Sequence, residues 1–143
     1  MPAARFRLVY RPRRSLGLHQ NNAPMFRGAL GAALHEIDRD GLYRALFDDG
    51  GSEGTVRPYR VRVELGPHGR IPPGQPFHVD LDLFGPALGA WPAVEEAARA
   101  AGVAGLGEER TPCDLASCLQ ALPDGWHDAD DRIARPVALG DLY

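Results

Sequence analysis

Apolar and polar residues alternate along several stretches of the chain, which is the period of a β-strand with one buried face. Residues 5–11 (RFRLVYR) place Phe6, Leu8 and Tyr10 on one side of such a strand. Pro12 is expected to end it. The pattern therefore predicts that the chain begins with a strand whose apolar face packs on a core.

Two stretches in the middle of the chain alternate in the same way, at residues 56–65 and 77–85. The turn between them, residues 66–76, is rich in proline and glycine, so we expect the two strands to pair as an antiparallel hairpin. A weaker strand is expected at about 108–115. Residues 42–47 (LYRALF) are expected to form a short helical turn or an extended segment.

The period changes to that of a helix at residues 23 to about 38 and at residues 91–102. Pro24 and Pro92 suit the first turns, and Gly102 is the expected C-terminal stop of the second helix. The resulting order is strand, helix, strand, strand, helix, strand. This predicts an α+β, ferredoxin-like (RRM-like) βαββαβ fold, with an antiparallel sheet and two helices on one face.

Charge is distributed unevenly, although the net charge of the 143 residues is only −3. All sixteen basic residues are arginine, whose guanidinium binds phosphate as a planar fork. Residues 1–35 hold six arginines and no acidic residue, whereas residues 108–143 hold eight acidic residues and three arginines. The asymmetry fits one nucleic-acid-binding face and a second face turned elsewhere, or a solvated asymmetry with no partner.

The first helix contains Gly28 and Gly31, each of which costs about 0.5–1 kcal/mol relative to alanine in a helix interior. Together with Ala29 and Ala32 they give the helix a nearly bare side. That side can pack very close to the sheet, or can lie against an RNA backbone beside Arg27. The sequence leaves both alternatives open.

The sequence contains few other motifs for metal binding, cofactor binding or catalysis. Cys113 and Cys118 form no C-x-x-C pair and have no second ligand pair nearby, so we expect two ordinary thiols, no metal site and no cofactor. No phosphate-binding Walker loop, G-x-S-x-G or H-E-x-x-H pattern is present. Without a run of eighteen apolar residues or a signal-peptide pattern, the sequence is expected to be soluble, cytoplasmic and without a membrane partner.

Five segments, taken in order, resemble the CRISPR-associated endoribonucleases that process pre-crRNA, in the RAMP (repeat-associated mysterious protein) superfamily. They are FRGALGAAL at 26–34, YRALF at 43–47, RPYRVRV at 57–63, GQPFHVDLDLFGPAL at 74–88 and GVAGLGEER at 102–110. The resemblance implies that residues 1–118 form a ferredoxin-like RAMP domain, similar to the first of the two such domains of the family, and leaves open a one-domain relative. Residues 119–143 would then be a C-terminal extension or a linker toward a second domain. The chain departs from the family at Ala32, where members often have histidine, and at Glu108 and Glu109, where basic residues are usual.

The resemblance implies binding of CRISPR repeat RNA or crRNA and leaves open whether the chain also cleaves pre-crRNA without a metal. In such cleavage the ribose 2′-hydroxyl attacks the adjacent phosphate, with a histidine as general acid or base. His19 and His35 are the candidate catalytic residues. The candidate RNA-binding residues are Arg11, Arg13, Arg14, Arg27, Arg57, Arg60 and Arg62. The alternative is a non-catalytic structural subunit of a CRISPR effector complex, which would contact other effector subunits or a second ferredoxin-like domain.

Overall fold

A computed structural model describes residues 2–18, 23–37, 59–64, 69–129, 135–138 and 140, with the side chains of 59–64 and of Pro86 left aside. Its main sheet has the order β3-β5-β1-β6-β7, and every pair in it is antiparallel. The strands in this order are β1 (Pro2–Pro12), β3 (Tyr59–Glu64), β5 (Phe77–Phe84), β6 (Cys113–Leu122) and β7 (Gly125–Asp128), and β8 (Val137–Ala138) adds to β1 as the sixth strand of the sheet.

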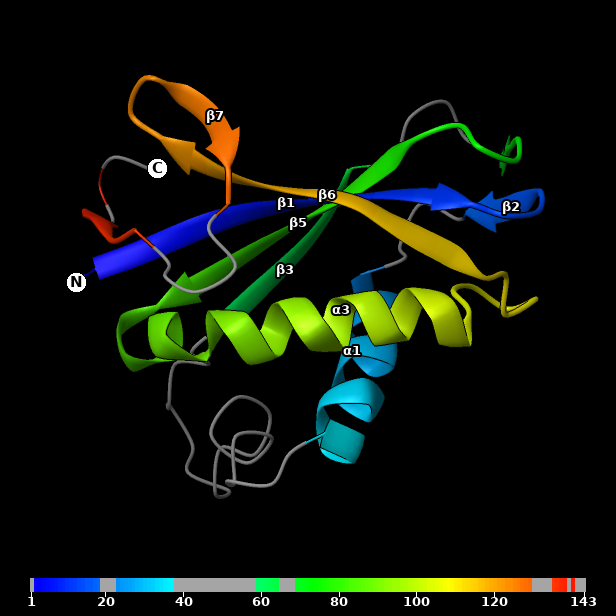
Figure 1. Ribbon diagram of the computed structural model, residues 1–143, viewed down its shortest axis with the longest axis horizontal. Helices are drawn as coiled ribbons and strands as arrows, with labels where there is room; N and C mark the ends of the chain where they lie inside the picture. The colour runs from blue at the N-terminus through cyan, green and yellow to red at the C-terminus, as the bar shows by residue number, and fades with distance from the viewer. Residues whose placement is uncertain are drawn as a thin grey trace.

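Both helices, α1 (Ala23–Ile37) and α3 (Trp91–Ala104), cover the same face of this sheet (Figure 1). A 3-10 helix, η1 (Gly85–Ala90), leads from β5 into α3. Within the main sheet and its helices the chain runs β1, α1, β3, β5, α3, β6, which is the βαββαβ order and confirms the ferredoxin-like fold. The predicted hairpin is also confirmed, because β3 pairs with β5 along its whole length.

The core lies between this face of the sheet and the helices. Phe6, Leu8 and Tyr10 of β1 are completely buried, as their alternation predicted. The ring of Phe6 stacks on Trp91 of α3 with 3.7 Å between centroids, and the Tyr10 hydroxyl donates a hydrogen bond of 2.7 Å to the carbonyl of Ala98. These contacts fix α3 against the central strand.

The opposite face of the sheet carries two ion pairs between β1 and β5. Arg5 binds Asp82 through both carboxylate oxygens, at 2.8 and 3.1 Å, and Arg7 binds Asp80 in the same way, at 2.9 and 3.1 Å. Asp82 is 0% and Asp80 4% exposed. The indole of Trp126 in β7 lies over the Arg7 guanidinium, 4.2 Å from the ring centroid. The polar side of the alternating pattern in β1 and β5 is therefore occupied by two ion pairs whose carboxylates are buried.

Two predicted boundaries are wrong for identifiable reasons. Gly102 does not end the second helix, which continues to Ala104 and is capped by Gly105 at φ 114°. Gly102 instead permits close packing, because an added Cβ would lie 2.5 Å from the carbonyl oxygen of Cys113. The weak strand expected at 108–115 starts only at Cys113, because the residues before it form a tight turn.

Short strands also occur where the sequence indicated only loops. β2 (Leu16–Leu18) and β4 (Gly69–Ile71) form a two-stranded antiparallel ribbon. Three-residue strands carry too little alternation to be recognised. The segment expected at 42–47 lies outside the described residues.

The C-terminal part joins the same sheet. β6 continues past residue 118, and β8 (Val137–Ala138) pairs with the start of β1. The buried side chain of Gln120 holds the Arg135 backbone through its N–H and its carbonyl, at 3.1 and 2.5 Å. The domain division at residue 118 stays a prediction. Within the described ranges, no helix is long and apolar enough to cross a membrane.

Candidate functional site

A tight turn after α3, residues 105–110, packs against the β2–β4 ribbon; we call it the glycine-rich turn. Leu106 and Thr111 close it with two backbone hydrogen bonds of 2.9 Å. Gly107 lies so near the ribbon that an added Cβ would be 3.3 Å from the Leu16 side chain. The backbone N–H of Gly107 also contacts the sulfur of Met25 at 3.3 Å, which joins the turn to the first part of α1.

Four arginines come from the end of β1, from the segment after it and from β4, which pairs with β2 beside this turn. They are Arg11, Arg13, Arg14 and Arg70, which we call the basic end. Arg13 pairs with Asp114 at 2.7 Å and Arg70 with Glu109 at 2.5 Å. These hydrogen bonds lower the pKa of both carboxyl groups below its usual value, so both pairs are charged at neutral pH.

The other two arginines of the basic end have no carboxylate bound among the described residues. Arg11 is exposed and donates a hydrogen bond of 3.0 Å to the carbonyl of Gly74, which leaves its charge uncompensated. Arg14 is exposed and interacts with Glu109 only through space, where its charge helps to lower the pKa of that carboxyl. Arg11 and Arg14 are therefore available to bind an anion.

The remaining predicted RNA contacts lie elsewhere. Arg27 is half-buried on α1. Arg60 and Arg62 lie in β3, the strand at the other edge of the main sheet from β7, in register with Asp82 and Asp80. Arg57 lies outside the described residues. The structure thus brings together Arg11, Arg13 and Arg14 and places Arg60 and Arg62 apart from them, and all of these contacts remain predictions.

The histidine candidates are not assembled into a described catalytic set. His35 is exposed near the C-terminal end of α1, whereas the glycine-rich turn contacts Met25 at its other end. Ten residues of helix separate the two positions, or about 15 Å along the axis. His19 lies outside the described residues. Catalysis by either histidine stays a prediction.

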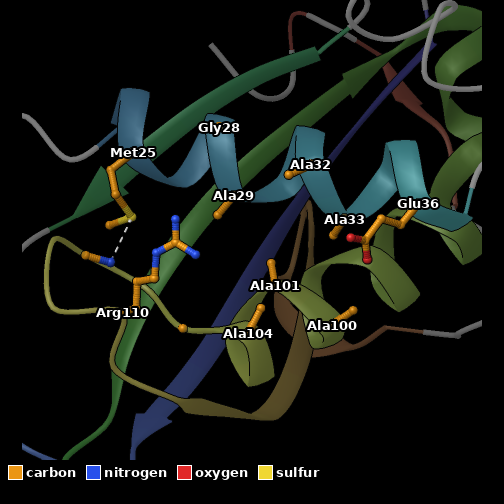
Figure 2. Close-up of a pocket in the computed structure, with 12 residues that line it drawn as sticks. Met25, Gly28, Ala29, Ala32, Ala33, Glu36, Ala100, Ala101, Ala104 and Arg110 are labelled. Carbon is orange, nitrogen blue, oxygen red and sulfur yellow. Dashed lines mark hydrogen bonds between the residues drawn. The ribbon is translucent and has the colours of Figure 1, made fainter.

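A cavity of about 330 Å³ opens between α1 and α3 beside the glycine-rich turn (Figure 2); we call it the interhelical groove. Its lining is mostly alanine and glycine: Met25, Gly28, Ala29, Ala32, Ala33, Glu36, Ala100, Ala101, Ala104, Gly105, Gly107 and Arg110. The bare side of α1 therefore faces this groove, and an added Cβ on Gly28 would meet no atom within 4 Å. Of the four small residues that the sequence places on the bare side of α1, only Gly31 is buried, together with Leu30 and Leu34.

Arg110 is the one arginine among the described residues that line the groove. Figure 2 shows its side chain extending from the glycine-rich turn toward α1. Its φ is +48°, the left-handed region, which among the described residues no other non-glycine residue adopts. That conformation costs about 1–2 kcal/mol for a residue with a side chain. No motif or periodic pattern around Arg110 predicted this backbone conformation.

Gly28→Ala is expected to raise the free energy of unfolding by about 0.5–1 kcal/mol, because alanine restricts the unfolded chain and the added methyl enters open space. Thermal or urea unfolding measures the change. A destabilised variant would show that the groove side of α1 is already packed.

The described thiols and acids offer no metal or redox chemistry to this site. Burial raises the pKa of Cys113 to about 11 and that of Cys118 to about 12, so both remain protonated thiols at neutral pH. In the part of the chain that the structure describes, no three His, Cys, Asp or Glu side chains come together to hold a metal ion. The geometry supports anion binding by arginine.

Comparison with solved structures agrees with the fold. A chain of the "Cas6 (TTHB231) product complex" superposes with a TM-score of 0.56 at 21% identity, over 87% of this chain and 42% of that one. This protein thus spans less than half the length of that chain. A chain of the Csm3–Csm4 subcomplex in the type III-A CRISPR-Cas interference complex superposes with a TM-score of 0.56 at 11% identity, over 99% of this chain and 92% of that one.

These likenesses establish a ferredoxin-like fold of the kind seen in RAMP proteins. No curated protein matches the sequence. A family described as an N-terminal domain, AF_1859_N, matches residues 1–136, which is nearly the whole chain. The protein therefore belongs to the AF_1859_N family, N-terminal domain.

Proposed function

We propose that this protein binds single-stranded CRISPR repeat RNA, or the crRNA derived from it, as a RAMP-type RNA-holding protein. The observation that carries the proposal is the basic end, where Arg11 and Arg14 are exposed and bind no carboxylate of the described residues. The first part of α1, which contacts the glycine-rich turn through Met25, adds a positive helix dipole that also favours an anion. The similarity in fold to Cas6 and Csm3–Csm4 chains supports an RNA of CRISPR origin.

The two ion pairs of the basic end are compatible with this role. Both Asp114 and Arg13 are more than half exposed, as are Glu109 and Arg70. Exposed pairs of this kind contribute little to stability, so an RNA phosphate can replace a carboxylate at small cost. Binding should therefore be weak at high salt, because phosphate contacts release counterions from the RNA.

The test is a double variant, Arg11→Ala with Arg14→Ala, titrated with repeat RNA at several salt concentrations. Two phosphate contacts fewer should lower the slope of log K against log salt by about 1.4 for a single strand. We expect affinity to fall about tenfold or more at low salt. The matched control, Arg99→Ala with Arg135→Ala, removes the same charge from α3 and from the C-terminal segment. Equal losses of RNA affinity in both variants would mean that only the net charge of the protein matters and that the basic end is not the binding site.

Cleavage of pre-crRNA is the second function to test. The separation of His35 from the basic end favours RNA holding without cleavage. Incubation with repeat RNA in EDTA should therefore give binding without a product ending in a 2′,3′-cyclic phosphate. If that product forms, loss of it in His19→Ala or His35→Ala would identify the catalytic residue.

Contacts with other effector subunits, or with a second ferredoxin-like domain, belong to the same proposal. β7 is an edge strand of the sheet, and all four of its residues are exposed. On its outer edge β7 pairs with no described strand, so its backbone there and the exposed Trp126 can accept a partner strand. A complex that holds the RNA from several subunits would use the basic end and β7 on different sides of the same domain.

A further inference from the structure

We propose that the interhelical groove seats one unstacked nucleotide of the bound RNA, with Arg110 holding its phosphate. The inference rests on the proposed RNA binding and goes beyond it, because the basic end alone would contact only the backbone. It assigns a role to Arg110 and to the alanine-lined walls.

The walls of the groove suit a flat apolar group. Ala29 and Ala32 of α1 face Ala101 and Ala104 of α3, so that methyl groups line both sides (Figure 2). A volume of about 330 Å³ is within the usual range of small-ligand sites. Nucleobases present apolar faces of this kind, and proteins that bind single strands commonly take bases out of their stack.

The groove carries a positive side chain at one end and a negative side chain at the other. Arg110 lies at the end next to the glycine-rich turn, and Glu36 lies at the other end (Figure 2). A phosphate is attracted to the first and repelled by the second, so a nucleotide would enter with its base toward Glu36. Neither side chain has a hydrogen bond or an ion pair with another described residue. The positive φ of Arg110 is a cost that glycine would avoid, which points to a role for its side chain.

Continuity with the basic end identifies RNA, rather than an acidic peptide, as the occupant. Arg110 is adjacent in sequence to Glu109, which pairs with Arg70 of the basic end. A phosphate bound at Arg70 therefore lies beside the turn that carries Arg110. A nucleotide attached to that phosphate lies at the mouth of the groove.

Arg110→Gly is the sharpest test, because glycine fits the backbone conformation and removes only the side chain. We expect an unchanged or higher melting temperature. Affinity for repeat RNA should fall about 5- to 10-fold, and the salt slope should fall by about 0.7, the value of one single-strand phosphate contact. The control Arg135→Ala removes one exposed charge outside the groove. An Arg110→Gly loss no larger than that of Arg135→Ala would overturn the proposal.

A second variant tests the walls independently of charge. Ala32→Leu fills the groove from an exposed position of α1, whereas Val103→Leu adds bulk to an exposed position of α3 outside it. With repeat RNA carrying 2-aminopurine at successive positions, wild type should brighten at one unstacked position. Ala32→Leu should abolish that signal and Val103→Leu should keep it.

Three further outcomes would decide the case. A signal that survives in Ala32→Leu overturns the groove as the nucleotide site and leaves the proposed RNA binding intact. Affinity that depends on Arg11 and Arg14 but not on Arg110 does the same. Failure of the wild-type protein to bind repeat RNA at all overturns both proposals together.

Discussion

Replacing Asp82 by alanine is expected to lower the free energy of unfolding by about 3–5 kcal/mol, the range for breaking a buried ion pair by removing one partner. Asp82 is fully buried and the side chain of Arg5 is only 14% exposed. Arg5 would lose two hydrogen bonds, at 2.8 and 3.1 Å, with little access to water in exchange. Because β1 is the central strand and β5 its neighbour, the loss would act on the whole sheet.

Urea unfolding followed by circular dichroism measures this effect. The matched control is Asp114→Ala, which breaks the exposed pair with Arg13 and should leave stability almost unchanged. A double variant, Arg5→Met with Asp82→Leu, should recover part of the loss, because it removes both charges of this pair together. If Asp82→Ala and Asp114→Ala proved equally mild, the sheet face opposite the helices would have to be open to water.

The fold was predictable because its main strands and helices carry their own periodic patterns. Alternation identified β1 and β5, and the helical period identified α1 and α3. Alternation assigns a residue to a face, but it says nothing about which residue stands opposite. The pairing of Arg5 with Asp82 depends on the register of two strands 77 positions apart, so it became visible only in the folded chain.

The candidate site was predictable only where its residues are neighbours in sequence. Arg11, Arg13 and Arg14 lie within four positions and necessarily fold together. Arg70 and Arg110 join them through the β2–β4 ribbon and the glycine-rich turn, neither of which has a periodic signal. The backbone conformation of Arg110 is set by the closure of its turn and has no counterpart in composition or charge.

Gly102→Ala is the second substitution with a large expected effect. The added Cβ would lie 2.5 Å from the carbonyl oxygen of Cys113 and 2.9 Å from the Tyr10 ring, so α3 must move away from β6. Overpacking of a core site costs about 1–3 kcal/mol, and the backbone neighbour here favours the upper end of that range. Urea unfolding should show the loss, whereas Gly28→Ala in the other helix should show a gain.

Movement of α3 would also reach the candidate site, because the glycine-rich turn begins directly after this helix at Gly105. The clash therefore displaces Arg110 relative to α1 while leaving Arg11 and Arg14 on the β1 side unchanged. Under conditions where the variant is fully folded, its RNA affinity should fall to about that of Arg110→Gly, and adding Arg110→Gly to it should have little further effect. Independent, additive losses would mean that the position of α3 does not control the groove. A shared loss would place Gly102 in the line of contacts from Tyr10 through α3 to Arg110.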